Sequence, residues 1–234
     1  MQRSGWYPDE LASAGDEHLD PEYVAMYDRK SATDPSDDVA ILQAHGLGPE
    51  SVVVDLGGGT GTFAQAVAPL CGRVVVVDIS PAMLAALQSR IEQYKLANIE
   101  VVQAGLLSYE HQGEPADFIY SRNALHHLPD FWKAVALTRM AGMLKPGGVL
   151  RLHDLVYAFD PAEAPEVFEA WLGRAQLRPE DGWTRAELET HIREEYSTFN
   201  WLLEPMLERA GFEILTANER DSKTYGAYTC RKRA

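Results

Sequence analysis

Residues 52–64, VVVDLGGGTGTFA, decide the fold of this chain. An apolar strand runs into a glycine loop and then into the start of a helix, and a second apolar run at 74–77 ends in Asp78. This arrangement is typical of a nucleotide-binding half-sheet, because glycines let the backbone approach the ligand and the acid accepts from ribose hydroxyls. The sequence therefore predicts a ligand with an adenosine end.

Strand-like and helix-like runs alternate through the middle of the chain, which favours a parallel sheet with crossover helices. Helices are expected at 61–70, 81–95 and 131–143, the second with Ser80 as its cap and Pro81 in its first turn. The stretch 145–148, KPGG, should end the third helix. Strands are expected at 51–55, 73–78, 99–104, 116–121 and 148–155, with a closing hairpin of 212–217 and 224–230 at the sheet edge. The predicted fold is an α/β, doubly wound, mostly parallel seven-stranded sheet.

We expect a single domain, 1–234, in four parts. Residues 1–50 form an N-terminal helical cap, 51–155 the cofactor-binding core, 156–211 a helical lid insertion and 212–234 the terminal hairpin. The lid segment contains eight aromatic residues, and Thr184 with Glu187 matches a capping box that starts a helix. Such an insertion is expected over the carboxyl ends of the strands, where ligands bind in open α/β sheets.

Composition excludes several classes of function. The net charge of −14 disfavours nucleic acid as a partner, and no apolar run approaches the length needed to span a membrane. Two cysteines, Cys71 and Cys230, are too few for a disulfide framework, and the N-terminal residues lack the pattern of a secretory signal. The sequence predicts a cytoplasmic protein and leaves its oligomeric state open.

Four blocks together resemble the class I S-adenosylmethionine-dependent methyltransferases, in particular the small-molecule branch that includes quinone-biosynthesis enzymes. The blocks are D-x-G-x-G-x-G at 55–61, DISPAML at 78–84, NALHHLPD at 123–130 and LKPGG at 144–148. The resemblance implies the Rossmann-like methyltransferase fold, S-adenosyl-L-methionine as cofactor with S-adenosyl-L-homocysteine as product, and methyl transfer to a small-molecule acceptor.

Two alternative functions stay open at this stage. The stretch 59–64, GTGTFA, also satisfies the fingerprint of NAD-dependent dehydrogenases, with Asp78 about 20 residues further on. Asp55 argues against that reading, because a pyrophosphate beside it would place anion against anion, whereas an ammonium group would be attracted. The other alternative is a cofactor-binding regulator that has no turnover.

The resemblance implies a set of cofactor contacts. Asp55 with the glycine backbone would hold the methionine moiety, Asp78 the ribose, and apolar residues the adenine. Many family members place an Asp after the third strand to accept from the adenine amino group, but 103–107, QAGLL, contains no acid. For Asn123 the equal alternative to a cofactor contact is capping of its loop. For Tyr27 it is packing within the N-terminal cap. The candidate contacts are Tyr27, Asp55, Gly57, Gly59, Gly61, Asp78, Ile79, Met83, Gly105, Leu106 and Asn123.

Methyl transfer depends mainly on proximity and orientation, so a base is needed only if the acceptor arrives protonated. His126 and His127 are the candidate bases, and only one of them is expected to face the substrate. Candidate acceptor contacts are His153, Trp171 and Tyr196.

Other polar residues of the lid are given no catalytic role. His191 is expected at the surface, and Glu195 is left open. No metal is expected, because no single element carries His and acidic residues at ligand spacing. The expected acceptor is a neutral or weakly polar metabolite that is methylated on oxygen, nitrogen or carbon.

Overall fold

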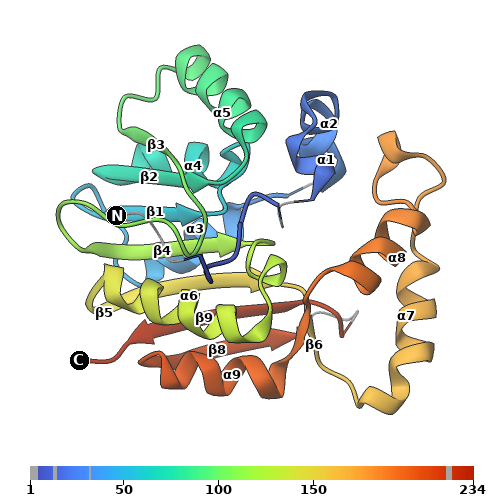
Figure 1. Cartoon of the computed structure of the whole chain (residues 1–234). Coiled ribbons are helices and arrows are strands. Elements are labelled where there is room, and N and C mark those ends of the chain that lie inside the picture. Colours follow the sequence, from blue (N-terminus) through green and yellow to red (C-terminus); the bar gives the residue numbers. More distant parts are fainter. Residues whose placement is uncertain (1–4, 13–14, 32, 220–222) are drawn as a thin grey trace.

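The computed structural model describes residues 5–12, 15–31, 33–219 and 223–234. Its main feature is a seven-stranded sheet with the strand order β3-β2-β1-β4-β5-β9-β8 (Figure 1). Strands β1 to β5 are parallel, and β9 runs antiparallel to both β5 and β8. The predicted mostly parallel sheet with a closing hairpin is confirmed. The strands are β1 Val52–Leu56, β2 Arg73–Asp78, β3 Ile99–Gln103, β4 Ala116–Arg122, β5 Leu144–Asp154, β8 Phe212–Glu219 and β9 Gly226–Lys232.

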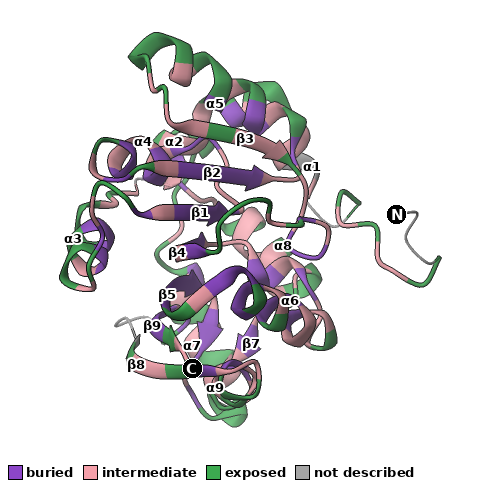
Figure 2. Ribbon diagram, turned by 90° about the vertical axis from the view of Figure 1, so that its left-hand side faces the viewer, coloured by how far each residue is buried: buried purple, intermediate pink, exposed green. Residues whose placement is uncertain are grey.

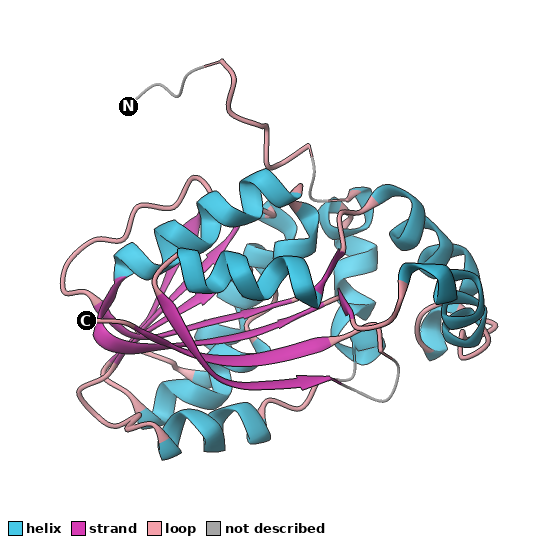
Figure 3. Ribbon diagram, turned by 90° about the horizontal axis from the view of Figure 1, so that it is seen from below, coloured by secondary structure: helices cyan, strands magenta, loops and turns pink. Residues whose placement is uncertain are grey.

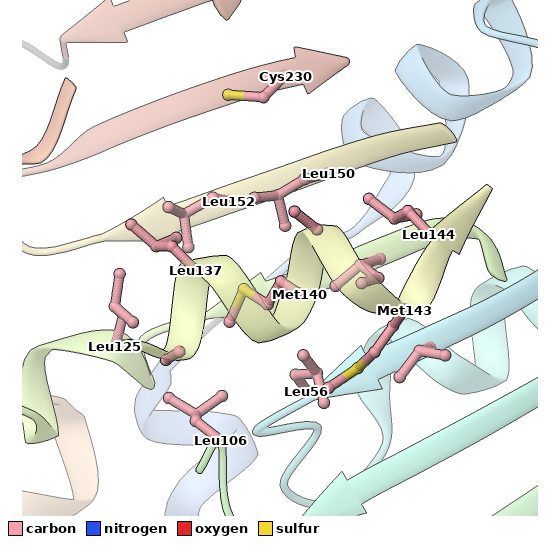
Figure 4. Packing of buried hydrophobic residues seen from close by; sticks show 14 of the residues in the cluster. Leu56, Leu106, Leu125, Leu137, Met140, Met143, Leu144, Leu150, Leu152 and Cys230 are labelled. Carbon is pink, nitrogen blue, oxygen red and sulfur yellow. The ribbon is translucent and has the colours of Figure 1, made fainter. Parts of the chain in front are cut away.

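Helices cover both faces of this sheet (Figure 3). One face packs against α3 (Ser36–Ala44), α4 (Thr62–Val67) and α5 (Pro81–Tyr94), and the other against α6 (Asp130–Met143) and α9 (Asn200–Arg209). The central strands are buried (Figure 2). Their valines alternate between the faces: Val53 and Val74 belong to one core, Val54 and Val75 to the other. Figure 4 shows Leu137 and Met140 of α6 pointing into the second core.

The local signals in the core predict its elements well. Ser80 Oγ accepts from the Met83 N–H at 3.1 Å and caps α5, and the segment predicted as 61–70 forms α4 followed by the short helix η1 (Ala68–Leu70). One boundary was wrong: β5 begins at Leu144, not at 148. Leu144 pairs with Ala116 and is 1% exposed, so core packing extends the strand past the Pro-Gly-Gly turn signal through an irregular register.

The N-terminal segment differs from the expected uniform cap. Helices α1 (Asp16–Leu19) and α2 (Pro21–Ser31) lie at the carboxyl ends of the strands, whereas α3 packs into the sheet core through Val39 and Leu42. Asp38 of α3 is 3% exposed, accepts from Arg151 Nε at 2.8 Å and lies 2.6 Å from His153 Nε2. Burial alone would raise the pKa of Asp38, but these two partners hold it well below its usual range.

The insertion after β5 contains a lid and a core helix. Its lid part holds η3 (Pro161–Glu163), α7 (Ala164–Leu172), η4 (Pro179–Asp181) and α8 (Arg185–Glu194), with a small sheet of β6 (Val156–Tyr157) and β7 (Thr198–Phe199) at its base. The predicted capping box at Thr184 is present. Five of the eight aromatics pack on one another: Tyr157, Phe159, Phe168, Phe199 and Trp201. Helix α9 buries Leu203 and Leu207 against the sheet, so the lid ends before α9. Across the described ranges, no helix is long and apolar enough to cross a membrane.

Gly61 provides a test of how α4 is fitted to α5. Its φ is +81°, and a Cβ there would lie 2.3 Å from Leu87 Cδ1, in the core. We expect Gly61→Ala to lower the free energy of unfolding by about 1–3 kcal/mol through overpacking. The matched control is Gly142→Ala on α6, where a Cβ meets nothing within 4 Å and where the helix should gain up to about 1 kcal/mol. Equal urea midpoints for the two variants would contradict this account.

Candidate functional site

A cavity lies at the carboxyl ends of β1, β2 and β4, beside the glycine loop that follows β1. Hydrogen bonds pin this loop to the end of β2: Gly57 and Gly58 both donate to the Val77 carbonyl, and Gly59 donates to Asp78 Oδ2 at 2.8 Å. The cavity has two adjoining lobes. Its lining residues include Glu10, His18, Tyr27, Asp55, Gly57, Gly58, Gly59, Thr60, Asp78, Ile79, Met83, Ala104, Gly105, Leu106, Arg122, Asn123 and His127.

The glycines of the loop serve different purposes. At Gly57, with φ at +72°, a Cβ would lie 2.4 Å from Ala124 Cβ, and at Gly58 it would lie 2.8 Å from Asp55 Oδ2. At Gly59 the nearest atom would be Met83 Sδ at 3.8 Å, which leaves open space toward the cavity. Gly61 lies outside the lining and packs against α5. The prediction that Gly61 contacts a cofactor is therefore replaced by a packing role.

Asp55 is the most unusual group of the site. The residue is 1% exposed, and its Oδ2 has no hydrogen-bond partner among the residues that the structure describes. Burial, and then the neighbouring Asp78, raise the pKa of Asp55 to about 8. A buried acceptor with no donor is expected to receive one from a ligand.

Arg122, the last residue of β4, is the corresponding donor and was missed in the sequence. Its Nε atom is buried and finds no hydrogen-bond partner within the described ranges, while Nη1 lies 3.6 Å from Asp38 Oδ2. Arg122 lines the same lobe as Asp55. The signal was available, because β4 neighbours β1 and ends at the same edge of the sheet.

The other lobe combines an acid with apolar walls. Asp78 accepts from the backbone of Gly59 and Ser80 at 2.8 Å, and burial raises its pKa although these hydrogen bonds oppose the shift. Ile79 and Met83 line one wall of this lobe. Gly105 and Leu106 line it from the loop after β3.

A second acid reaches this lobe from the N-terminal segment. Glu10 Oε1 accepts from the Leu107 N–H at 2.8 Å, and a Cβ on Gly105 would lie 2.3 Å from the same oxygen. The chain thus brings a carboxylate to the loop after β3, where the local sequence offers none. No sequence pattern indicated the contact between Glu10 and Leu107, because the two residues lie 97 positions apart.

Tyr27 and Asn123 both line the cavity, as their candidate role requires. Asn123 has φ at +52°, and its Oδ1 accepts from the Tyr225 hydroxyl at 2.5 Å. Tyr225 also lines a second cavity beneath the lid together with Trp171 and Trp183. The Asn123–Tyr225 pair therefore joins the two cavities.

The adjacent histidines of η2 (Leu125–His127) have different surroundings, although their ring centroids lie only 4.3 Å apart. His127 lines the cavity next to His18, and burial together with the charge of His126 lowers its pKa to about 3. His126 is not part of this lining, and its Nδ1 is hydrogen-bonded to Asp154 Oδ1 at 2.5 Å. Burial would lower the pKa of His126, but Asp154 outweighs it and raises the value.

Several sequence expectations need correction. His153 is 2% exposed and bonded to Asp38, outside the cavity lining. The Tyr196 side chain is 48% exposed, and only its backbone contacts the site, through the His126 carbonyl at 2.9 Å. Trp171, in contrast, lines the cavity beneath the lid, so its candidate role as an acceptor contact stays a prediction.

One expectation about the lid was also wrong, and the expectation that no metal binds stays a prediction. His191 is not a surface residue: its Nε2 lies 2.9 Å from Ser197 Oγ, and its ring lies 5.1 Å from that of His126. Potential metal ligands do cluster, because His126, His127 and Glu195 place ligand atoms within 4.8 Å of one another. These residues come from two distant segments, so no pattern within a single element indicated the cluster.

Comparison with known proteins agrees with this architecture. Residues 53–148 match the family model described as a methyltransferase domain. The chain is 32% identical over 101 residues to phosphoethanolamine N-methyltransferase 2 of Caenorhabditis elegans, covering 43% of this chain and 23% of that protein. It is also 32% identical over 114 residues to the ubiquinone biosynthesis O-methyltransferase of Xanthomonas campestris pv. campestris, covering 46% of this chain and 44% of that one. The alignments thus span less than half the length of both relatives.

The fold itself has a full-length counterpart. The crystal structure of magnesium protoporphyrin IX methyltransferase from Synechocystis with bound SAM superimposes with a TM-score of 0.66 at 15% identity, covering 98% of this chain and all of that one. The resemblance to methyltransferases that the four sequence blocks indicated is confirmed over residues 53–148, the stretch that matches the model of a methyltransferase domain.

Proposed function

We propose that the chain binds S-adenosyl-L-methionine in the two-lobed cavity and transfers its methyl group to a small-molecule acceptor, leaving S-adenosyl-L-homocysteine. One observation carries the proposal. Asp55 Oδ2 and Arg122 Nε are buried atoms of opposite polarity, each without a hydrogen-bond partner, in one lobe. The α-ammonium and α-carboxylate of a methionine moiety would satisfy both.

The second lobe suits the adenosine end of the same cofactor. Asp78 would accept from the ribose hydroxyls, and Ile79 and Met83 would pack against the base. Glu10 would accept from the adenine amino group, because its carboxylate lies at the loop after β3. A carboxylate oxygen can accept more than one hydrogen bond, so the bond from Leu107 leaves this role available.

These charges disfavour the dehydrogenase alternative. The cavity contains three carboxylates, of Glu10, Asp55 and Asp78. A pyrophosphate would have to approach Asp55 at the glycine loop, where the two anions repel. A cofactor with a sulfonium and an ammonium group is attracted instead.

Catalysis would depend on positioning. When bound, the cofactor supplies an electrophilic methyl group on a sulfonium, so the protein has to align the acceptor with it and exclude water. His127 and Tyr27 line the cavity near its lid side. With a pKa near 3, His127 stays neutral at physiological pH. It can therefore accept a hydrogen bond from an acceptor hydroxyl or amine, which makes it a positioning group more than a strong base.

The proposed acceptor is a neutral or weakly polar metabolite. The net charge of −14 repels polyanions, which argues against nucleic acid as substrate. The lid cavity, with Trp171, Trp183 and Tyr225 in its wall, offers aromatic surface for such an acceptor. We further propose a cytoplasmic location, because the buried cysteines Cys71 and Cys230 are both free.

Calorimetry with S-adenosylhomocysteine and with NAD tests the cofactor, and labelled S-adenosylmethionine with a metabolite extract tests transfer. We expect S-adenosylhomocysteine to bind and Asp78→Ala to weaken it by about 1.5–3 kcal/mol, the scale of a hydrogen bond to a charged group. Glu92→Ala, an exposed charge removal on α5, is the control. Binding of NAD alone would refute the proposal, and binding of S-adenosylhomocysteine without any transfer would support the regulator.

Stability should report the buried acid at Asp55. Its folded-state pKa of about 8 exceeds the unfolded value of about 4, so its contribution is favourable below pH 4 and is lost as the pH rises to 8. Asp55→Asn carries no such loss. We expect the stability of the wild type relative to the variant to fall by up to several kcal/mol between pH 4.5 and pH 9, about 1.4 per pKa unit at most. Parallel pH profiles in urea denaturation would rule out this raised pKa.

Base selectivity should report Glu10. S-Inosylhomocysteine replaces the adenine amino group with a carbonyl oxygen. A carboxylate repels this oxygen, whereas an amide N–H can donate a hydrogen bond to it. We expect the wild type to favour S-adenosylhomocysteine by at least about tenfold, and Glu10→Gln to reduce that ratio by about tenfold, a scale of 1.4 kcal/mol. Glu22→Gln, an exposed acid on α2, should leave the ratio unchanged. An unaltered ratio in Glu10→Gln, with normal S-adenosylhomocysteine binding, would remove Glu10 from the base site.

A further inference from the structure

A histidine and carboxylate cluster joins the lid to the cavity wall. His126 and His127 come from η2 after β4, and Glu195 follows α8 in the lid. Their potential ligand atoms all lie within 4.8 Å of one another, and His126 is buried. We propose that these three residues bind one divalent transition-metal ion, with Zn²⁺ as the best fit to two imidazoles and one carboxylate. The proposal does not depend on methyl transfer.

The contact between His126 and Glu195 has the spacing of two ligands on one ion. His126 Nε2 lies 3.2 Å from Glu195 Oε2. Two ligand atoms on a tetrahedral Zn²⁺, with bonds of about 2.0–2.1 Å, stand roughly 3.3 Å apart. Two histidine nitrogens, His126 Nε2 and His191 Nδ1, converge on this Glu195 oxygen. Such convergence fits lone pairs that face a common point.

A buried acid holds the ring of His126 in the orientation that metal binding needs. Asp154 Oδ1 lies 2.5 Å from His126 Nδ1, and Asp154 is itself fixed by the backbone N–H groups of Leu125 and Leu155, both at 2.7 Å. This hydrogen bond occupies Nδ1 and leaves Nε2 as the ligand atom on the side of Glu195. A carboxylate behind a ligating histidine is the usual outer partner at zinc sites.

The position of the cluster gives the ion a defined environment. His127 lines the proposed cofactor cavity, and its ring lies 5.6 Å from that of His18 across the same wall. On the other side, the His191 ring packs edge-on to Trp171 at 5.7 Å. Three protein ligands leave one tetrahedral position for water or for an oxygen or nitrogen of a small molecule in the cavity, as in catalytic zinc sites.

The competing explanation is a purely ionic cluster, in which protonated histidines pair with Glu195 and Asp154 and fasten the lid without any metal. Both explanations predict a stable lid. They differ in whether the full chain, freed of metal by a chelator and dialysed, binds Zn²⁺ tightly and once per chain.

The experiment is calorimetric titration of the metal-free full chain with ZnCl₂, together with absorption spectra of the Co²⁺-substituted protein. We expect one ion per chain and the d–d bands of four-coordinate Co²⁺. Glu195→Gln, which keeps the side-chain shape, should weaken Zn²⁺ by at least about 100-fold, and Asp154→Asn by about 10–100-fold as an outer partner. Glu194→Gln, the exposed neighbouring acid, should bind like the wild type.

Binding of S-adenosylhomocysteine to each variant serves as the check on folding and separates this proposal from the proposed function. A wild-type chain that binds S-adenosylhomocysteine but no Zn²⁺ overturns the metal site. Equal Zn²⁺ affinity in Glu195→Gln and Glu194→Gln overturns it as well, since the ion would then bind elsewhere.

Discussion

The turn from β1 into α4 is the constraint on which the rest of the site depends. Its amide groups bond to the end of β2, which fixes the distance between the two acidic strand ends at Asp55 and Asp78. Side chains cannot be added there without contact, since a Cβ at Gly57 or Gly58 would meet Ala124 or Asp55 itself. The turn therefore leaves two carboxylates buried about one cavity with little room to relax.

Burying Asp55 without a cation is unfavourable, and the fold tolerates it because the surrounding sheet is held together by many other contacts. The raised pKa is the direct consequence of this arrangement. Arg122 does not neutralise Asp55, because its guanidinium is drawn toward Asp38 and the Tyr225 ring. The two charges are thus kept apart, which is the arrangement a zwitterionic ligand requires.

Segments far from the glycine loop complete the cavity. Asp38 anchors α3 to β5 through Arg151 and His153, so the chain that follows α2 is tied to the sheet. On the lid side, the Lys133 ammonium of α6 donates to the Leu128 carbonyl at 2.7 Å and contacts the Tyr196 carbonyl. These buried polar contacts fasten α3 and the lid backbone at Tyr196 to the core elements beside the cavity.

The sequence by itself determined the parallel core, because alternating valines, a capped α5 and the glycine loop are local signals that act within a few residues. It also determined the positions of Asp55, Gly57, Gly59 and Asp78, since strand ends in a parallel sheet meet at one edge. Only the tertiary structure decided the roles of Glu10, Arg122 and Glu195, and the burial of His153. Their partners lie from 69 to 115 residues away, and no periodicity or capping signal encodes contacts across such separations.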